Sequence, residues 1–292
     1  MADADMTNKI VVITGANSGI GKVAARQLAS MGANVVMICR NRERGEEARS
    51  EIIHATQNSN VMLLLADLSD QKQVRAVAHE FCEIYEKADV LINNAGIIDN
   101  ARHETPDGIE RTLAVNHLGA FLLTNLLMKR LTKADEARII TVSSEAHKYS
   151  DFDIDNVQLE RGYSPLKAYA NSKLCNILFT YELNKKIKAG NHSVTAKCLH
   201  PGAVATKFGY GGSIWFKLIW LISKPFLISP EKGAETMVYL ATDPDITQNE
   251  SLYYKNKKPA KPIDKAYNSN LAEKLWQKSM ELTNLDEEDQ II

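Results

Sequence analysis

A tyrosine and a lysine four residues apart, Tyr169 and Lys173, are the residues of this sequence best suited to chemistry. They lie in a segment expected to be helical from about 165 to 188, and residues four apart on a helix share one face. A free phenol titrates near pH ~10, and a neighbouring cation lowers that pKa by stabilising the phenolate. Such a tyrosine can exchange a proton with an alcohol or carbonyl oxygen. Because a packed tyrosine and a solvated lysine would give the same spacing, the interpretation depends on the residues upstream.

Short apolar runs alternate with helical patterns along the first 200 residues. Strands are expected at 9–14, 33–39, 60–65, 89–92, 137–143 and 193–199, with helices at 22–31, 41–56, 70–87, 108–131 and 165–188. Near-continuous apolar strands are typical of a parallel sheet that is covered on both faces. Right-handed crossovers make such a sheet doubly wound. The predicted fold is therefore α/β, with a single doubly wound parallel sheet, and residues 1–292 are expected to form one domain.

A glycine-rich loop joins the first expected strand to the first expected helix, Gly15-Ala16-Asn17-Ser18-Gly19-Ile20-Gly21. Glycines let the backbone turn sharply and let a phosphate approach closely. The following helix N-terminus offers unpaired N–H groups and a positive dipole end to a pyrophosphate. The glycine spacing differs from G-x-G-x-x-G, but the strand–loop–helix context is the one that this motif requires. The loop predicts a dinucleotide site; the alternative is a tight turn whose glycines serve packing alone.

The second expected strand ends at Arg40, with Arg42 and Arg44 close by and no acid before Glu43. At this position an acidic residue would bind the ribose 2′-hydroxyl of NAD, whereas an arginine suits a 2′-phosphate. The sequence therefore favours NADP(H) over NAD(H). An exposed arginine at the start of a helix is the plainer alternative.

Polar residues also follow the third and fourth expected strands. The third ends in Ala66-Asp67-Leu68, where a carboxylate can bind an adenine amino group or cap a helix, a role for which Asp70 competes. The fourth ends in Asn93-Asn94-Ala95-Gly96, whose amides can tie adjacent strand ends together. All these residues fall at carboxyl ends of strands, where ligands bind in open α/β sheets.

Taken together, these motifs resemble the short-chain dehydrogenase/reductase family. The matching residues follow the family's order over about 9–206: 14–21, Asp67, 93–96, Asn116, Ser143-Ser144, Tyr169, Lys173 and Pro201-Gly202. Residues 39–41, 142–147 and 200–202, with the tail at 255–283, further resemble the retinol dehydrogenase branch. The resemblance implies a Rossmann-type fold and hydride transfer between NADP(H) and an alcohol/carbonyl pair.

The resemblance also implies a role for each catalytic residue. Tyr169 would be the general acid/base, and Lys173 would bind the nicotinamide ribose and lower the Tyr169 pKa. Ser144 would hydrogen-bond the reacting oxygen, while Ser143 supports the strand end. Asn116 would bend its helix and hold a proton-relaying water. Ser144 could equally just end a strand, and Asn116 could be a satisfied buried amide.

The same resemblance places a loop at 202–206 around the nicotinamide, with the Val204 backbone and the Thr206 hydroxyl as carboxamide contacts. The complete set of expected cofactor-binding residues is Gly15, Asn17, Ser18, Gly19, Ile20, Gly21, Arg40, Asp67, Leu68, Asn94, Ala95, Gly96, Tyr169, Lys173, Pro201, Gly202, Val204 and Thr206.

Two regions are expected to shape the substrate side. An insertion at about 151–166 separates Ser144 from Tyr169; His147 and Tyr149 precede it, and for both a packing role is favoured over contact with substrate. Residues 207–228 are rich in aromatic and aliphatic side chains, and the apolar stretch within them, 213–228, is too short to span a bilayer. We expect them to form an apolar wall over a lipophilic substrate; shallow contact with a membrane surface and an ordinary buried helix are the alternatives. Residues 255–292 form a C-terminal extension.

Composition excludes several other classes of protein. With 35 basic and 36 acidic residues there is no basic excess, so nucleic-acid binding is not expected. The cysteines and the seven histidines lack metal-ligand spacing, which gives a metal site no support. Free thiols and the lack of a signal-peptide pattern at the N-terminus favour a cytoplasmic location, with membrane association left open. The four cysteines are Cys39, Cys82, Cys175 and Cys198.

The sequence thus predicts an NADP(H)-dependent oxidoreductase that interconverts an alcohol and an aldehyde or ketone, with a lipophilic, retinoid-like small molecule as substrate. A non-catalytic NADP(H)-binding redox sensor and an NAD-dependent dehydrogenase are the alternatives, because a fold does not fix a function. A homo-oligomer is also left open, since the family often pairs its long helices between subunits.

Overall fold

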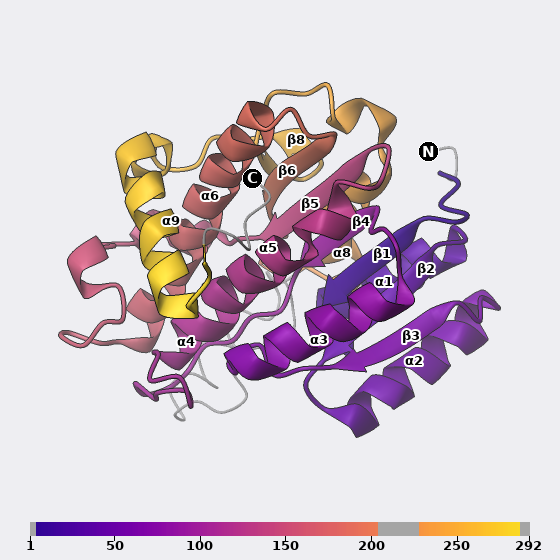
Figure 1. Cartoon of the computed structure of the whole chain (residues 1–292), viewed down its shortest axis with the longest axis horizontal. Coiled ribbons are helices and arrows are strands. Elements are labelled where there is room, and N and C mark those ends of the chain that lie inside the picture. The colour runs from indigo at the N-terminus through magenta and orange to yellow at the C-terminus, as the bar shows by residue number, and fades with distance from the viewer. Residues whose placement is uncertain (1–3, 204–227, 287–292) are drawn as a thin grey trace.

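Within residues 4–203 and 228–286, which this computed structural model describes, eight strands form one sheet in the order β3-β2-β1-β4-β5-β6-β7-β8 (Figure 1). Neighbouring strands from β3 to β7 run parallel, and β8 returns antiparallel to β7. The strands are β1 (Ile10–Thr14), β2 (Asn34–Cys39), β3 (Val61–Leu65), β4 (Val90–Asn93), β5 (Ala137–Val142), β6 (Val194–His200), β7 (Tyr253–Lys255) and β8 (Lys258–Pro259). The predicted doubly wound parallel sheet is confirmed. Its strand order reverses between β1 and β4, which is where ligands bind in such sheets.

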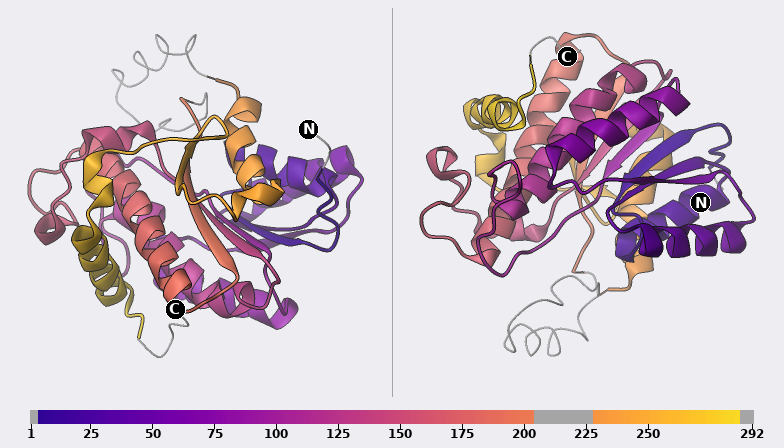
Figure 2. Two further views of the ribbon diagram at one scale, coloured as in Figure 1. Left: turned by 90° about the horizontal axis from the view of Figure 1, so that it is seen from above. Right: turned by 60° about the horizontal axis from the view of Figure 1, so that its bottom comes forward.

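Helices cover both faces of the sheet, which explains why the strands are apolar on both sides (Figure 2). In β1, Val11 and Ile13 join one buried cluster and Val12 joins the other, because successive side chains of a strand point to opposite faces. One face packs against α1 (Gly19–Ser30), α2 (Arg42–Thr56) and α8 (Pro230–Thr242). The other face packs against α3 (Gln71–Ile84), α5 (Gly119–Leu131) and α6 (Pro165–Ala189).

Polar side chains cap the N-termini of helices α3 and α8. Asp70 caps α3 by accepting hydrogen bonds from the backbone N–H groups of Lys72 and Gln73, at 3.0 and 3.3 Å. This leaves the Asp67 carboxylate free of a capping role. Ser229 caps α8 ahead of Pro230 by accepting a hydrogen bond from the Lys232 N–H at 3.2 Å.

The helix expected at 108–131 is interrupted in the structure. It begins as α4 (Arg111–Leu113), passes through a π-helical turn at Ala114–Leu118, and continues as α5. Asn116 lies within the π turn, in agreement with the expected bend at that residue. Such turns widen a helix by one residue and are frequent at functional sites.

The C-terminal extension packs onto the helical layer and the sheet edge. Strands β7 and β8 form a hairpin at this edge, with Tyr254 paired to Pro259. Helix α9 (Ser269–Thr283) lies beside α6 (Figures 1 and 2) and buries Trp276. The Trp276 ring stacks on Phe179, with ring centroids 5.9 Å apart, and meets Phe121 edge-on at 5.0 Å.

We expect the Trp276→Ala variant to lose about 3–5 kcal/mol of unfolding free energy, because removing a buried aromatic ring leaves a cavity that the helices cannot fill. Trp276→Phe should lose much less, since the Trp276 indole N–H has no hydrogen-bond partner in the described part of the chain. Chemical denaturation of the three proteins measures both effects. An alanine variant within about 1 kcal/mol of the parent would show that α9 is not part of the cooperative core.

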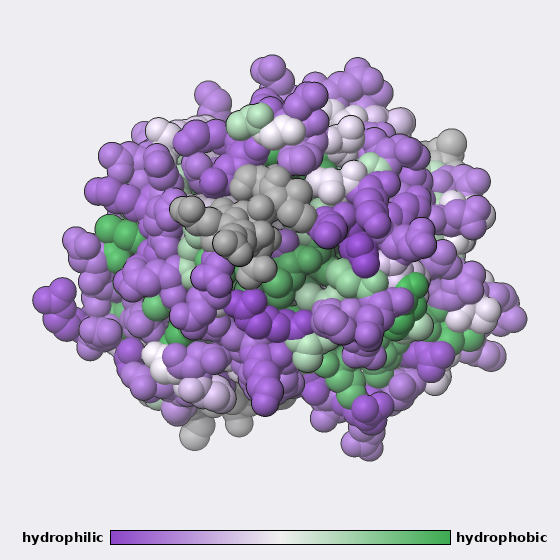
Figure 3. Space-filling model, viewed as in Figure 1, coloured by the Kyte–Doolittle hydropathy of each residue, from purple (hydrophilic) through white to green (hydrophobic). Residues whose placement is uncertain are grey.

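The molecular surface on the face in Figure 3 is mostly polar, with apolar side chains in smaller groups between charged ones. No helix in the described ranges is long and apolar enough to cross a membrane. Cys39, Cys175 and Cys198 are buried free thiols and Cys82 is partly buried. Most of the apolar segment at 207–228 lies outside the described residues.

Candidate active site

Lys173 lies at the centre of the predicted site, on the face of α6 that meets the carboxyl ends of β4 and β5. Its side chain is 3% exposed, and its ammonium donates a hydrogen bond to the Val142 carbonyl at 3.0 Å. Gly96 lies next to it: a Cβ atom at that position would come within 3.4 Å of both Lys173 Nζ and Asn116 Oδ1. The structure therefore brings together residues that are widely separated in the sequence.

Ser144 and Tyr169 come together as the sequence predicts. Their side chains share a hydrogen bond, which joins the end of β5 to the first turns of α6. Ser144 also begins a short 3-10 helix, η2 (Glu145–Tyr149), and its hydroxyl accepts a hydrogen bond from the Ala146 N–H at 3.2 Å. Both residues are half-buried.

The electrostatics of the pair differ from the expectation. Burial raises the pKa of Tyr169 to about 12, and the hydrogen bond from Ser144 only partly opposes this rise. Burial also lowers the pKa of Lys173 to about 8. The Lys173 ammonium lies 5.5 Å from the centre of the Tyr169 ring, so it faces the ring and the Val142 carbonyl. The expected lowering of the Tyr169 pKa by Lys173 is therefore wrong for this arrangement, and Tyr169 is protonated at neutral pH.

Asn116 is held rigidly in its π turn. Its amide oxygen accepts a hydrogen bond from the Ile97 N–H at 2.7 Å, and its amide nitrogen donates to the Ile97 carbonyl at 2.9 Å and to Ser172 Oγ at 3.0 Å. The side chain thus connects the loop after β4 to α6. Its position beside Lys173 agrees with the expectation, while its role in holding a water stays a prediction.

Ser143 supports the strand end as expected, because its hydroxyl donates to the Lys173 carbonyl at 2.7 Å. Asn94 ties β4 to β1 by donating to the Thr14 carbonyl at 2.8 Å. The Thr14 hydroxyl accepts from the backbone N–H groups of Asn94 and Ala95, both at 3.0 Å. These bonds fix the strand ends on which the site is built.

The glycine-rich loop fits a dinucleotide phosphate. Helix α1 has no acid in its first turn, and the Ser18 side chain makes no capping bond, so the positive helix end is not neutralised. Gly15 has φ +67, and a Cβ on Gly21 would lie 2.4 Å from Asn94 Nδ2. The glycines therefore serve close packing as well. The loop thus has features of both alternatives, a phosphate site and a tightly packed turn. Asn17, Gly19 and Ile20 lie between Gly15 and Gly21 in the same strand–helix connection.

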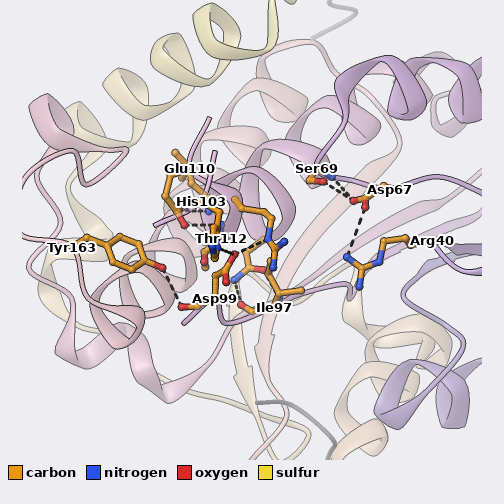
Figure 4. A network of polar contacts seen from close by, with 12 residues as sticks. Arg40, Asp67, Ser69, Ile97, Asp99, His103, Glu110, Thr112 and Tyr163 are labelled. Atoms are coloured by element: carbon orange, nitrogen blue, oxygen red, sulfur yellow. Dashed lines mark hydrogen bonds and ion pairs between the residues drawn. The ribbon is translucent and has the colours of Figure 1, made fainter. Parts of the chain in front are cut away.

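Arg40 and Asp67 meet across the ends of β2 and β3 (Figure 4). Arg40 Nη1 lies 3.7 Å from Asp67 Oδ2, with the side chains 63% and 27% exposed. The Ser69 hydroxyl donates to the other Asp67 oxygen at 2.7 Å. Leu68 is buried, with its backbone carbonyl and its Cβ atom against Gly119.

A second cluster near the site has no signal in the sequence (Figure 4). The buried Asp99 carboxylate lies 2.6 Å from Arg111 Nε and 3.1 Å from His103 Nδ1. The Tyr163 hydroxyl donates to the Asp99 carbonyl at 3.1 Å. The cluster joins the loop after β4 to the insertion before α6. In the sequence, Asp99 close after Gly96 is the signal that could have indicated this cluster, and an isolated Asp in a loop is not distinctive.

The expected nicotinamide loop is described only at its start. Gly202 has φ +96, a backbone conformation that favours glycine, and the Ala203 carbonyl accepts from the Ile228 N–H at 2.8 Å. Pro201 is half-buried beside it. Val204 and Thr206 lie outside the described residues, so their expected contacts stay predictions.

The two residues that precede the insertion differ from each other. His147 is fully buried, in agreement with the packing role expected for it. Tyr149 is 85% exposed, so the same expectation is wrong for Tyr149. The η2 helix turns Tyr149 outward because the next residue, Ser150, is tied to α6 by a 2.7 Å hydrogen bond with Asn171.

A doubly wound sheet with a glycine-rich phosphate loop and a Ser–Tyr pair beside a buried lysine is the arrangement of a dinucleotide-dependent oxidoreductase. A family model described as short chain dehydrogenase matches residues 9–210. Human retinol dehydrogenase 12 is 40% identical over 283 residues, covering 97% of this chain and 89% of the relative. Human retinol dehydrogenase 14 is 40% identical over 287 residues, covering 93% and 85%. The chain belongs to the short-chain dehydrogenase/reductase family, in its retinol dehydrogenase-like branch.

Solved structures share the fold. A crystal structure of a protein from Mycobacterium paratuberculosis has a TM-score of 0.77 at 34% identity and covers 96% of this chain and 95% of that chain. A short-chain dehydrogenase from Escherichia coli CFT073 in complex with NADPH has a TM-score of 0.68 at 20% identity, covering 88% and 100%. The predicted family and its Rossmann-type fold are thereby confirmed.

Proposed function

We propose that the protein is an NADP(H)-dependent enzyme that interconverts a lipophilic alcohol, of the retinol type, and its aldehyde or ketone. The observation that carries this proposal is the hydrogen-bonded pair of Ser144 and Tyr169, with Lys173 buried beside it at the strand ends. A pure redox sensor has no need of a proton donor beside a serine hydroxyl at the strand ends.

Tyr169 and Ser144 handle the reacting oxygen. Since Tyr169 is protonated at neutral pH, it is suited to donate its proton to a carbonyl oxygen as that oxygen gains negative charge. Ser144, with its carbonyl and hydroxyl both held in place, hydrogen-bonds the same oxygen.

The cofactor would lie across the ends of β1, β2 and β4. The first-turn N–H groups of α1 would hold the pyrophosphate, Arg40 the 2′-phosphate, and Lys173 the nicotinamide ribose. Bound NADPH would supply the hydride. The choice of NADP rests on Arg40 and, at the level of the fold, on the Escherichia coli structure that contains NADPH.

The substrate class rests on the relatives. Two proteins named retinol dehydrogenases align with 97% and 93% of this chain. The apolar composition of residues 207–228 supports a lipophilic substrate, with this segment lining one side of the substrate site.

Absorbance at the nicotinamide band tests the proposal. NADPH and NADH would be compared against a panel of aldehydes and ketones from short and polar to long and apolar, retinal included. We expect NADPH oxidation whose kcat/KM rises with the apolarity of the substrate. Tight NADPH binding without turnover on any member of the panel would contradict the enzyme and favour the sensor.

A further inference from the structure

A buried histidine, His147, contacts the backbone of the segment that carries Ser144. We propose that His147 is a positioning residue, which fixes Ser144 through the serine's own carbonyl and anchors it to the C-terminal extension. The inference rests on the proposed function, because it concerns the use of Ser144.

The two ring nitrogens of His147 have different partners. Nδ1 lies 2.6 Å from the Ser144 carbonyl oxygen, and Nε2 accepts a hydrogen bond from the Ile263 N–H at 3.3 Å. Because Nε2 accepts, the proton of the neutral imidazole sits on Nδ1 and is donated to Ser144. The ring is fully buried and meets Tyr253 edge-on at 5.5 Å, so it cannot swing away.

Further bonds hold the peptide that follows Ser144. His200 Nδ1 on β6 accepts from the Glu145 N–H at 3.2 Å. The Glu145 carboxylate is held between Lys148 and Lys255, at 2.7 and 3.2 Å. The backbone of Ser144 is thus fixed on both sides, which leaves its hydroxyl aimed at Tyr169.

Burial keeps the two histidines in the form that these bonds require. It lowers the pKa of His147 and lowers the pKa of His200 to about 4, although Glu145 favours the charged form of both. A neutral ring can accept from the Ile263 N–H, whereas an imidazolium cannot. The contacts are therefore present across the neutral range.

Two substitutions separate the two contacts. Asparagine places its amide nitrogen near the position of Nδ1, so His147→Asn keeps a donor for the Ser144 carbonyl and loses the contact with Ile263. Glutamine reaches the position of Nε2, so His147→Gln keeps an acceptor for the Ile263 N–H and loses the contact with Ser144. We expect His147→Asn to stay within about threefold of the parent kcat and His147→Gln to fall by about 10- to 100-fold, since small misplacement of a reacting group is costly.

The measurements are kcat, the aldehyde KM, the Kd for NADPH and the thermal midpoint of each variant. The predicted signature is a kcat difference between the two variants at equal NADPH Kd. Tyr253→Phe, which keeps the ring against His147, is the matched control and should retain the parent kcat. Equal kcat for His147→Asn and His147→Gln would overturn the inference, whether both are high or both are low.

Ser144→Ala, measured in parallel, separates this inference from the proposed function. If Ser144→Ala is inactive while the two His147 variants have equal kcat, only the positioning role fails. If Ser144→Ala keeps the parent kcat, the proposed site itself is wrong, and the positioning role falls with it.

Discussion

Tyr169→Phe should lower kcat by about 10²- to 10⁴-fold, the range that a positioned general acid contributes. The change removes only the hydroxyl that shares a hydrogen bond with Ser144. The ring that packs against Lys173 remains, so the Kd for NADPH should stay within about twofold of the parent value. Steady-state kinetics with the best aldehyde and a fluorescence titration with NADPH measure the two quantities.

Tyr181→Phe is the matched control, because it makes the same change on the same helix. Tyr181 lies against Tyr267, with ring centroids 5.6 Å apart, and is three turns beyond the site. Its kcat should equal that of the parent. Near-parental turnover by Tyr169→Phe would remove Tyr169 from the chemistry, whatever the effect on binding.

Arg40→Asp should reduce kcat/KM for NADPH by about 10- to 100-fold and leave that for NADH unchanged or higher. A hydrogen bond to a charged group contributes about 1.5–3 kcal/mol, and the new carboxylate would also repel the 2′-phosphate. Asp67, which faces Arg40 at 3.7 Å, would then add a second negative charge at the same place. The ratio of kcat/KM for the two cofactors measures the effect.

Lys258→Asp makes the same change of charge on β8, at the opposite edge of the sheet from β3. It should leave the cofactor ratio unchanged, which separates a local effect of Arg40 from an effect of net charge. An Arg40→Asp variant that keeps the parent preference for NADPH would show that the 2′-phosphate is read by other residues.

The sheet could be predicted because its physical cause is local. A strand buried on both faces must be apolar along its length, and the run from Ile10 to Thr14 shows this without knowledge of its neighbours. The return strand β8 could not be predicted in the same way. Its residues, such as Lys258, are charged and exposed, and only pairing with Tyr253–Lys255 makes them a strand.

The members of the site could also be predicted, because glycines at a strand end and a Tyr–Lys pair carry their chemistry in their spacing. The direction of the Tyr169 pKa could not. It depends on how deeply Tyr169 is buried and on where the Lys173 ammonium points, and neither follows from a spacing of four. Burial outweighs the neighbouring cation in this arrangement.

The polar contacts that support the site could not be predicted from the sequence, for a different reason. His147 and Ile263 are 116 residues apart, and Asp99 meets Arg111 through a loop without periodicity. Hydrophobic patterns report which face of an element is buried, but they do not report which polar groups meet across elements. The apparent packing role of Tyr149 failed similarly, since its outward direction is set by the tether at Ser150.

The most direct test of the proposed chemistry follows the hydride itself. NADPH carrying deuterium at both C4 positions would be incubated with the wild-type protein and the aldehyde that is turned over fastest, and the alcohol analysed by mass spectrometry and NMR. We expect one deuterium on the carbinol carbon for each NADPH consumed, and at least about 100-fold less labelled alcohol with Tyr169→Phe in the same time. Alcohol without deuterium, or NADPH binding with no alcohol formed, would contradict hydride transfer at this site.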